Sequence, residues 1–355
     1  MSVEHADVVV VGLGPAGACA AAAAARRGAR VIALDRRREP GRPVQCAEFV
    51  PAMIGLEGDA LARCARQRIA SMVTFVGDDP PELTTPFPGQ MLDRAAFDAA
   101  LVDLGVAAGA QCRFGASVRA LANDGRVELA DGAAIAAKVV VGADGPRSVV
   151  GRAIGRVNVA LVETRQITVP LRVAHQATDI FLSASIPGGY GWLFPKGAVA
   201  NLGVGVDPVH KHRLKAIVAE LHDALVGKGR VGAEVIAMTG GAIPVGGMLE
   251  PCAKLGPAHV LLAGDAAGLA NPVTGAGIAA GVYSGGLAGE VAAAIAAGRD
   301  EAAREYEDEL RSVLGGALAR ALRRRRELAA TAKRGAPDGA ALRRGWIAYP
   351  EYWAA

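Results

Sequence analysis

A glycine-rich segment near the start of the chain has the spacing needed to bind a phosphate group. Residues 12–17 read GLGPAG, which is the pattern G-x-G-x-x-G. In this pattern the first glycine permits a tight turn, the second lets the backbone approach a pyrophosphate, and the third lets a helix pack closely on a strand. The start of a helix also has free N–H groups, which attract phosphate. The alternative is an ordinary glycine turn.

A carboxylate suited to a sugar follows this motif. Asp35 ends the next apolar run, VIALD, and Arg36 comes directly after it. A carboxylate only accepts hydrogen bonds, so Asp35 can bind ribose hydroxyl groups. The sequence therefore predicts a dinucleotide site. The expected contacts are Gly12, Gly14, Pro15, Ala16, Gly17, Asp35 and Arg36.

A second glycine-rich region lies far along the chain. The segment LAGDAA at 262–267 is followed by Pro272 and by GAGIAAG at 275–281. Asp265 could bond a ribityl or ribose hydroxyl, and a helix beginning near Gly275 could direct its positive end at a flavin pyrimidine. A dinucleotide held at both ends is typical of tightly bound FAD. The expected contacts here are Gly264, Asp265, Pro272, Gly275, Gly277 and Ile278.

Three aromatic residues alternate in the segment GGYGWLFPKG, although the chain is only 4% aromatic. Tyr190, Trp192 and Phe194 stand at every second position, so one extended strand would turn all three to the same side. Two interpretations stay open. The rings belong to an ordinary core strand, or they form a wall beside a flat cofactor.

The glycine motifs together resemble a known family. G-x-G-x-x-G, the GADGPRS at 142–148 and the GDAAG at 264–268 resemble the three FAD motifs of the para-hydroxybenzoate hydroxylase-like flavoproteins, in the same order. The resemblance covers nearly the whole chain and implies FAD contacts for Ala143, Asp144 and Gly145. It also implies one for Arg94, in LDRAAFD, for which a solvated helix charge is the alternative.

The aromatic segment resembles one branch of that superfamily. Y-x-W-x-F-P at 190–195, followed by Gly203-Val204-Gly205, is similar to the signature of geranylgeranyl reductases. In that branch the rings line a cavity beside the isoalloxazine, where a prenyl double bond is reduced. Cys46 matches a position where the branch often has a cysteine facing the flavin; its alternative is an inert buried thiol. The implied catalytic residues are Cys46, Tyr190, Trp192 and Phe194, and Cys46 is also an expected flavin contact.

The resemblance implies an FAD-dependent reductase that saturates double bonds of an isoprenoid or related apolar substrate by hydride transfer from reduced flavin. The proton comes from Cys46, Tyr190 or ordered water. The sequence shows no second unit of strand, G-x-G-x-x-G turn and helix for a resident NAD(P)H, so the electron donor is expected to be transient NAD(P)H or a redox partner such as ferredoxin. Two alternatives stay open: an FAD-dependent aromatic or polyketide monooxygenase, and a flavin-bearing electron-transfer or binding protein.

The elements that must position these residues are visible as apolar runs. Strands at 7–12 and 29–35 flank a helix at 15–27, which predicts a parallel βαβ unit. Further buried strands are expected at 138–142 and 259–263, and alternating antiparallel strands at 165–206. The expected fold is α/β: a Rossmann-like FAD-binding domain interleaved with an antiparallel-sheet substrate domain, plus a C-terminal helical segment. The expected ranges are 1–70, 90–160 and 255–300 for FAD binding, 71–89 and 161–254 for substrate, and 301–355 for the helical region.

Composition narrows the remaining possibilities. A net charge of +4 over 355 residues is too weak to favour nucleic acid as a partner. Five cysteines without C-x-x-C spacing predict neither a disulfide framework nor a metal site, and favour a cytoplasmic location. The apolar segment 278–296 is interrupted by glycines and Glu290, which predicts a buried helix. His210 and His212 are expected at a solvated helix start.

The C-terminal region suggests peripheral contact with a membrane. The basic run 323–326 lies in a helical pattern, and aromatic residues follow it at 346, 349, 352 and 353. Basic side chains are attracted to anionic lipid, and aromatic rings favour the interface. The alternative is a charged, solvated helix with a tail folded back on the body.

Overall fold

A largely parallel sheet carries both glycine-rich regions. The computed structural model describes residues 3–51 and 62–354, so part of the expected range 1–70 lies outside the described residues. The strand order is β17-β18-β11-β1-β2-β8; β18, β11, β1, β2 and β8 run parallel to one another, and β17 pairs antiparallel with β18. The strands are β1 (Glu4–Val11), β2 (Val31–Asp35), β8 (Gln111–Phe114), β11 (Ala134–Gly142), β17 (Cys252–Leu255) and β18 (Ala258–Leu262). An antiparallel arm of β9 (Val118–Leu121) and β10 (Val127–Leu129) extends from β11.

Helices cover this sheet, and the two central ones are in unusually close contact. These helices are α1 (Pro15–Arg26), α3 (Arg94–Ala107), α4 (Val149–Ala153) and α6 (Ile278–Ala296), and α1 packs against both α3 and α6. A Cβ at Gly285 of α6 would lie 2.0 Å from the carbonyl oxygen of Ala16 in α1, and one at Gly289 would lie 2.2 Å from that of Ala20. Only glycine allows the two backbones to approach this closely. By length and composition α6 is the one helix in the described part of the chain that could cross a membrane, but it is half buried in this layer.

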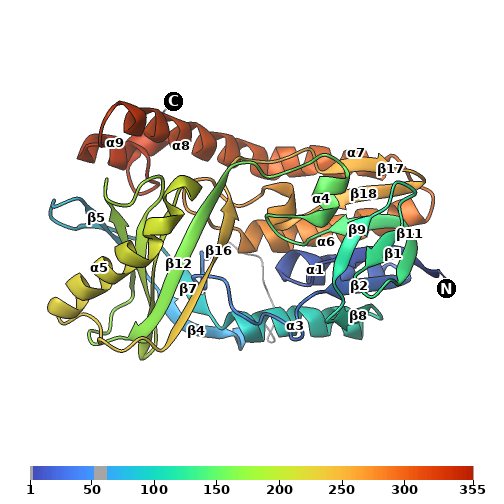
Figure 1. Cartoon of the computed structure of the whole chain (residues 1–355), viewed down its shortest axis with the longest axis horizontal. Coiled ribbons are helices and arrows are strands. Elements are labelled where there is room, and N and C mark those ends of the chain that lie inside the picture. The colour runs from blue at the N-terminus through green and yellow to red at the C-terminus, as the bar shows by residue number, and fades with distance from the viewer. Residues whose placement is uncertain (1–2, 52–61, 355) are drawn as a thin grey trace.

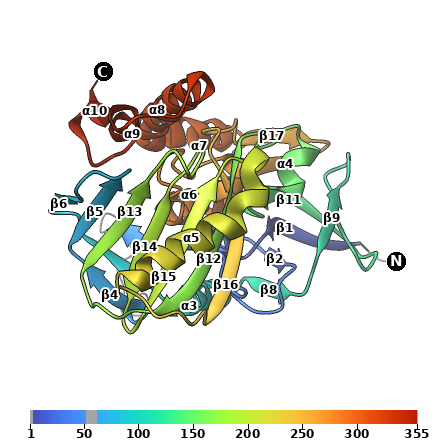
Figure 2. The ribbon, with the colours of Figure 1, turned by 60° about the vertical axis from the view of Figure 1, so that its left-hand side comes forward.

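The second sheet is mainly antiparallel and takes its strands from two separate parts of the chain. Its order is β16-β12-β15-β14-β13-β5-β6, with only the β13–β5 pair parallel. α5 (Leu214–Gly227), preceded by the 3-10 helix η1 (Pro208–Arg213), packs across one face (Figure 2). The strands are β5 (Ser71–Val76), β6 (Glu82–Thr84), β12 (Leu161–Pro170), β13 (Ala177–Leu182), β14 (Gly191–Lys196), β15 (Val199–Val206) and β16 (Ala237–Pro244).

A small sheet connects the two layers. It consists of β3 (Phe49–Pro51), β7 (Gly89–Leu92) and β4 (Ala65–Ile69), with β7 in the middle. β3 follows the Cys46 segment, and α3 begins two residues after β7 ends. The Cys46 segment and Arg94 are therefore both anchored by this small sheet. In Figure 1, α3 extends from the region of β4 and β7 toward β8 of the parallel sheet.

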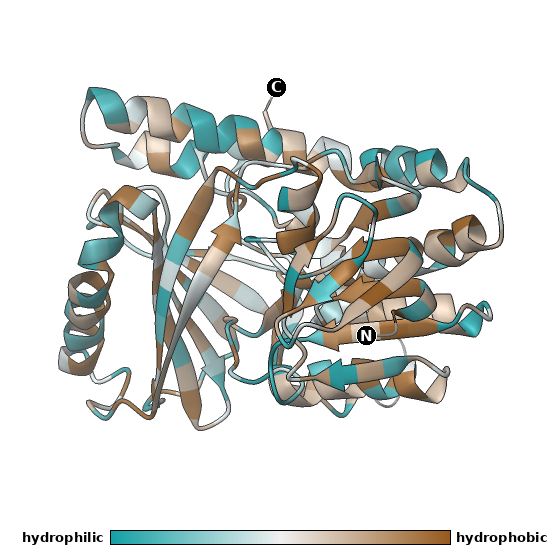
Figure 3. Ribbon diagram, turned by 45° about the vertical axis from the view of Figure 1, so that its right-hand side comes forward, coloured by the Kyte–Doolittle hydropathy of each residue, from teal (hydrophilic) through white to brown (hydrophobic). Residues whose placement is uncertain are grey.

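The C-terminal region runs along both layers (Figure 1). It contains α7 (Ala302–Leu310), a π-helical turn (Arg311–Gly315), α8 (Gly316–Arg334), α9 (Gly339–Arg344) and α10 (Pro350–Trp353). Arg343 fastens its far end to the antiparallel sheet, with ion pairs of 2.8 Å to Asp79 and 2.5 Å to Glu82. Figure 3 shows hydrophobic strands beneath and a largely hydrophilic α8 above them.

Most of the residues expected to meet a membrane are used inside the protein instead. Trp346, Tyr349 and Tyr352 are buried, while Trp353 is 56% exposed. Arg324 is also buried, donating to the backbone carbonyl oxygens of Tyr352 and Ala354. Arg325 pairs with Asp207 at 2.7 Å. The prediction that these side chains face a membrane is therefore wrong, because they pack or pair within the protein.

The expected elements are present, with shifted ends. The βαβ unit, the strands near 138–142 and 259–263, and the antiparallel region are all found. α6 begins at Ile278, three residues later than expected, because Gly275 has a φ of +69° and the chain still turns there. η1 contains His210 and His212, as expected of a helix start.

Candidate active site

The G-x-G-x-x-G segment forms a turn whose glycines are required by close backbone contacts. Gly12 has a φ of +94°, and a Cβ there would lie 2.4 Å from the carbonyl oxygen of Ala143. A Cβ at Gly17 would lie 1.7 Å from the carbonyl oxygen of Gly12. At Gly14, in contrast, an added Cβ meets nothing within 4 Å. Pro15 begins α1, and no side chain within residues 3–51 and 62–354 caps its first N–H groups. The turn therefore fits a pyrophosphate beside Gly14.

Asp35 is partly used by the protein itself, which the sequence did not reveal. One carboxylate oxygen accepts the Leu13 N–H at 2.8 Å and the other accepts the Arg37 N–H at 2.7 Å. Each oxygen keeps a second lone pair for a ribose hydroxyl. Arg36 is exposed, and its side chain makes no hydrogen bond or ion pair with the described residues. Asp35 thus fixes the glycine turn and still has acceptor capacity for a further hydrogen bond.

The two other acidic residues of the glycine motifs differ in what they bind. Asp144 accepts from the Ser148 hydroxyl at 2.5 Å and the Val149 N–H at 2.6 Å, so it caps the start of α4. Burial nevertheless raises the pKa of Asp144. The backbone carbonyl of Asp265 accepts from the Asn158 side chain at 2.9 Å, but its carboxylate accepts no hydrogen bond from the part of the chain described. Burial raises the pKa of Asp265 to about 6, against the lowering effect of Arg94. Its free carboxylate fits a hydroxyl donor of the cofactor.

The remaining motif residues lie around the same region. Ala143 and Gly145 follow β11, and a Cβ at Gly145 would meet nothing within 4 Å. Gly264 follows β18, and a Cβ there would lie 3.0 Å from that of Ala16. Gly277 is the N-cap of α6, and a Cβ there would lie 3.0 Å from the Asp265 carboxylate. The backbone carbonyl of Pro272 accepts from Arg325 at 3.4 Å.

The three alternating rings lie on one side of β14, as the spacing predicted. Ring centroids are 5.7 Å apart for Tyr190 and Trp192, and 6.3 Å apart for Trp192 and Phe194. Trp346 covers Tyr190 at 4.8 Å. A Cβ at Gly203, opposite Trp192 on β15, would lie 2.3 Å from the indole ring, so glycine is needed there to accommodate it.

The packing of this aromatic wall resembles a core strand. Trp192 and Phe194 are each 6% exposed, and they pack with Leu342, Trp346 and Tyr349 of the C-terminal region. Burial alone therefore does not separate the two interpretations of the rings. What distinguishes this face is its hydrogen bonding.

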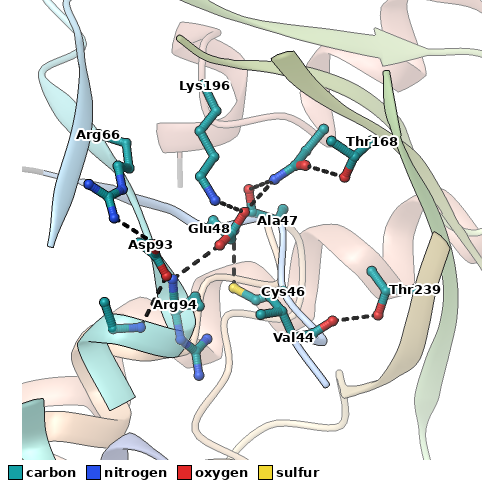
Figure 4. Close-up of polar contacts among 12 residues, drawn as sticks. Val44, Cys46, Ala47, Glu48, Arg66, Asp93, Arg94, Thr168, Lys196 and Thr239 are labelled. Carbon is teal, nitrogen blue, oxygen red and sulfur yellow. Dashed lines mark hydrogen bonds and ion pairs between the residues drawn. The ribbon is translucent and has the colours of Figure 1, made fainter. Parts of the chain in front are cut away.

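Hydrogen bonds connect the aromatic wall to the segment containing Cys46. The Trp192 indole N–H donates to the side-chain oxygen of Gln166 at 3.0 Å, and the amide nitrogen of Gln166 donates to the carbonyl of Cys46 at 3.1 Å. The Thr239 hydroxyl donates to the carbonyl of Val44 at 2.6 Å. The antiparallel sheet thus holds the backbone at Val44 and at Cys46; Figure 4 shows the bond from Thr239 to Val44.

Two candidate proton donors have different surroundings. The Tyr190 hydroxyl donates to the carbonyl of Thr274 at 2.5 Å, and burial, with a smaller effect from Cys46, raises the pKa of Tyr190. The Tyr190 hydroxyl group therefore keeps its proton. Cys46 is half-buried, and its sulfur accepts the Glu48 N–H at 3.1 Å.

Arg94 lies beside Cys46 and is not a solvated helix charge. Its side chain is only 14% exposed and donates two bonds to Asp98, at 3.0 and 3.1 Å. Burial alone would lower the pKa of Arg94, but Cys46 and Asp98 outweigh burial and raise it. The guanidinium also acts on Asp265, so it links the thiol to the second glycine-rich region.

Sequence reasoning missed Glu48, which is 5% exposed and has the φ of +68° that glycine usually adopts. Its carboxylate accepts from Lys196 at 2.6 Å, from Asn201 at 2.9 Å and from the Arg94 N–H at 3.1 Å. Lys196 is 148 residues away along the chain, so no local spacing could reveal this cluster.

Comparisons with known proteins identify the arrangement. Residues 5–189 match the FAD binding domain family, and residues 161–243 match the geranylgeranyl reductase catalytic domain. A digeranylgeranylglycerophospholipid reductase of Methanopyrus kandleri is 37% identical over 294 residues, covering 77% of this chain and 73% of the relative. The crystal structure of a geranylgeranyl bacteriochlorophyll reductase-like protein from Thermoplasma acidophilum has a TM-score of 0.83 at 25% identity, covering 96% of this chain and 90% of that one.

A probable FAD-dependent monooxygenase of Pseudomonas aeruginosa has a TM-score of 0.69 at 17% identity, which shows a shared fold alone. The α/β fold with C-terminal helices and the FAD cofactor are confirmed by the two matching families and the similar structure. The reductase interpretation is favoured over the monooxygenase, because the catalytic family matches the aromatic strand itself. The chain therefore belongs to the geranylgeranyl reductase family of FAD-dependent oxidoreductases.

Proposed function

We propose that this protein reduces the carbon–carbon double bonds of geranylgeranyl chains carried on a glycerophospholipid. The observation that carries the proposal is the aromatic wall of β14, which is hydrogen-bonded through Gln166 to the Cys46 segment. Relatives that are reductases of digeranylgeranylglycerophospholipid support a lipid of this kind. A wall of flat rings suits an isoprenoid chain and excludes water from the reacting carbons.

The chain's own groups have distinct proposed roles. FAD, when bound, supplies the hydride. The turn at Gly14 and the start of α1 hold its pyrophosphate, and Asp265 accepts a hydroxyl hydrogen bond. Trp192 and Phe194 orient the alkene. Cys46 is the better proton donor of the two candidates, because the hydroxyl proton of Tyr190 is already bonded to Thr274.

The substrate is proposed to lie between the antiparallel sheet and the C-terminal region. This layer is lined by apolar side chains such as Met72, Ile180 and Leu182. It also contains buried polar atoms without a hydrogen-bond partner among the described residues: the hydroxyls of Thr74 and Thr178, and the indole N–H of Trp346. Unpaired buried polar atoms are costly. The oxygen atoms of a glycerolipid would satisfy them.

A product analysis tests the proposed reaction. The FAD-loaded protein is reduced with dithionite and incubated anaerobically with a digeranylgeranyl glycerophospholipid, and the lipid is examined by mass spectrometry. Products heavier by pairs of hydrogens are expected. Trp192→Ala should keep FAD and lose most of this product. Unchanged lipid with the flavin still reduced would favour an electron-transfer or binding protein, and oxygen-containing products formed in air with NADPH would favour a monooxygenase.

The electron donor and the membrane contact are proposed more broadly. NAD(P)H binding transiently, or a redox protein such as ferredoxin, would reduce the flavin. A cytoplasmic protein that acts on a membrane lipid must meet the bilayer surface, and the exposed Arg323, Arg326 and Trp353 remain available for this. Sedimentation with anionic vesicles at low salt, lost at high salt, is expected. Protein that stays in the supernatant at low salt would refute surface binding.

A further inference from the structure

Glu48 has a backbone conformation that needs a physical cause. Its φ of +68° is the only positive value at a non-glycine residue within residues 3–51 and 62–354. A side chain makes this left-handed conformation unfavourable, so surrounding contacts must hold it. Conformations of this kind gather at functional sites. Glu48 lies two residues from Cys46, in the segment between the two main layers.

The contacts that hold Glu48 come from three different elements. Lys196, at the end of β14, and Asn201, on β15, both donate to one carboxylate oxygen, at 2.6 and 2.9 Å. The Arg94 N–H, at the start of α3, donates to the other at 3.1 Å. Asn201 is the register partner of Phe194, so the clamp grips the aromatic hairpin itself. Figure 4 shows Lys196 and the Arg94 backbone converging on Glu48.

The same residue donates to the thiol through its backbone. The Glu48 N–H lies 3.1 Å from the sulfur of Cys46. This bond depends on the dihedral angles of residues 46 and 47, because the Glu48 N–H belongs to the peptide group that joins Ala47 to Glu48. The side chain of Glu48 therefore fixes an atom that its main chain directs at Cys46.

We propose that Glu48 is a positioning residue, whose carboxylate clamps residues 46–48 to β14, β15 and α3 and thereby holds its own N–H on the Cys46 thiol. The inference rests on the proposed function only in taking Cys46 to contribute to the reaction. An N–H directed at the sulfur favours the thiolate. The clamp thus sets the place of the thiol relative to the aromatic wall.

The test removes the clamp without changing the local charge. Glu48→Gln combined with Lys196→Met replaces an ion pair by two neutral side chains. The other groups acting on Cys46, Arg94 from α3 and Tyr190 before β14, stay in place. Alkylation of Cys46 by iodoacetamide is followed against pH, with peptide mass spectrometry separating it from the other four cysteines. We expect the midpoint of alkylation to rise by about one pH unit.

A matched control removes another buried ion pair of the same sheet. Asp179 and Arg230 pair at 2.7 Å, and Asp179 is 1% exposed. Asp179→Asn combined with Arg230→Met should lower stability and leave the Cys46 midpoint unchanged. If the Glu48 double variant also leaves the midpoint unchanged, the proposal is overturned. If that variant fails to fold, Glu48→Asp replaces it, because the shorter side chain keeps the charge but cannot reach all three donors. A smaller rise of the Cys46 alkylation midpoint then supports the proposal, and a midpoint equal to that of the wild type overturns it.

Kinetics separate this inference from the proposed function. The Glu48 double variant should lower kcat several-fold with KM unchanged. In a Cys46→Ala background, the same two substitutions should cause no further loss of kcat. If the alkylation midpoint rises but kcat does not fall, the positioning role of Glu48 is supported, and the proposed role of Cys46 in the reaction is contradicted. A kcat loss that persists in full in the Cys46→Ala background would show that Glu48 does not act through the thiol.

Discussion

The close contact between α1 and α6 allows a quantitative test of the cofactor site. Gly285→Ala places a methyl group 2.0 Å from the carbonyl oxygen of Ala16 and 2.7 Å from its carbonyl and α carbons. All three are backbone atoms, so no side chain can move aside. Ala16 belongs to the G-x-G-x-x-G turn, so any separation of the helices displaces the start of α1.

The expected magnitude follows from two opposing effects. Alanine in a helix interior is favoured over glycine by about 0.5–1 kcal/mol. Overpacking against rigid neighbours costs about 1–3 kcal/mol or more, and an overlap of this size with backbone belongs at the upper end. We therefore expect a net loss of about 2 kcal/mol, or about 4–8 °C in Tm if each kcal/mol is worth about 2–4 °C. FAD affinity should fall about tenfold, which corresponds to about 1.4 kcal/mol.

A matched control lies on the same helix. A Cβ at Gly286 would meet nothing within 4 Å, so Gly286→Ala should stabilise the protein by about 0.5–1 kcal/mol and leave FAD binding unchanged. Thermal unfolding of the apoprotein by circular dichroism and FAD titration by flavin fluorescence measure the two effects. If Gly285→Ala behaves like Gly286→Ala in both assays, the proposed packing of α6 against the phosphate turn is refuted.

Three further results are expected. Gly14→Val should fold normally, because its Cβ has open space, yet lose bound FAD in absorbance spectra; normal flavin content would contradict the pyrophosphate site. Trp192→Phe leaves the Gln166 oxygen unpaired, so chemical denaturation should show a loss of about 1–3 kcal/mol with FAD retained, and an unchanged midpoint would count against that bond. Burial raises the pKa of Asp265 to about 6, so the folded apoprotein binds this proton more tightly than the unfolded chain, and stability falls as pH rises from about 4 to about 6. Asp265→Asn should flatten that slope in urea unfolding of the apoprotein at pH 4.5 and 6.5; an equal slope in both proteins would assign it to other groups.

The parts of the fold that sequence could predict are those specified locally. The βαβ unit follows from neighbouring apolar runs and a glycine turn, and the aromatic face follows from the two-residue period of a strand. The clamp at Glu48 could not be predicted, because its partners come from strands far along the chain. The burial of the aromatic residues of the C-terminal tail could not be predicted for a related reason. An aromatic-rich segment has the same composition whether its rings are buried or face a membrane. The contact between Trp346 and Tyr190, which are far apart in the sequence, becomes visible only in the structure.

Closure of the aromatic wall by residues 342–349 also affects how the chain is made. Trp192 leaves the ribosome well before Trp346, and at about 5–20 residues per second the delay is about 8–30 s. Throughout this interval the antiparallel sheet has strands but no cover for its rings. The nucleotide layer is incomplete as well, because β18 and α6 come late in the chain. Nascent chains of this protein therefore display an apolar face that chaperones can bind, and release from them is expected only after α9 docks through Arg343.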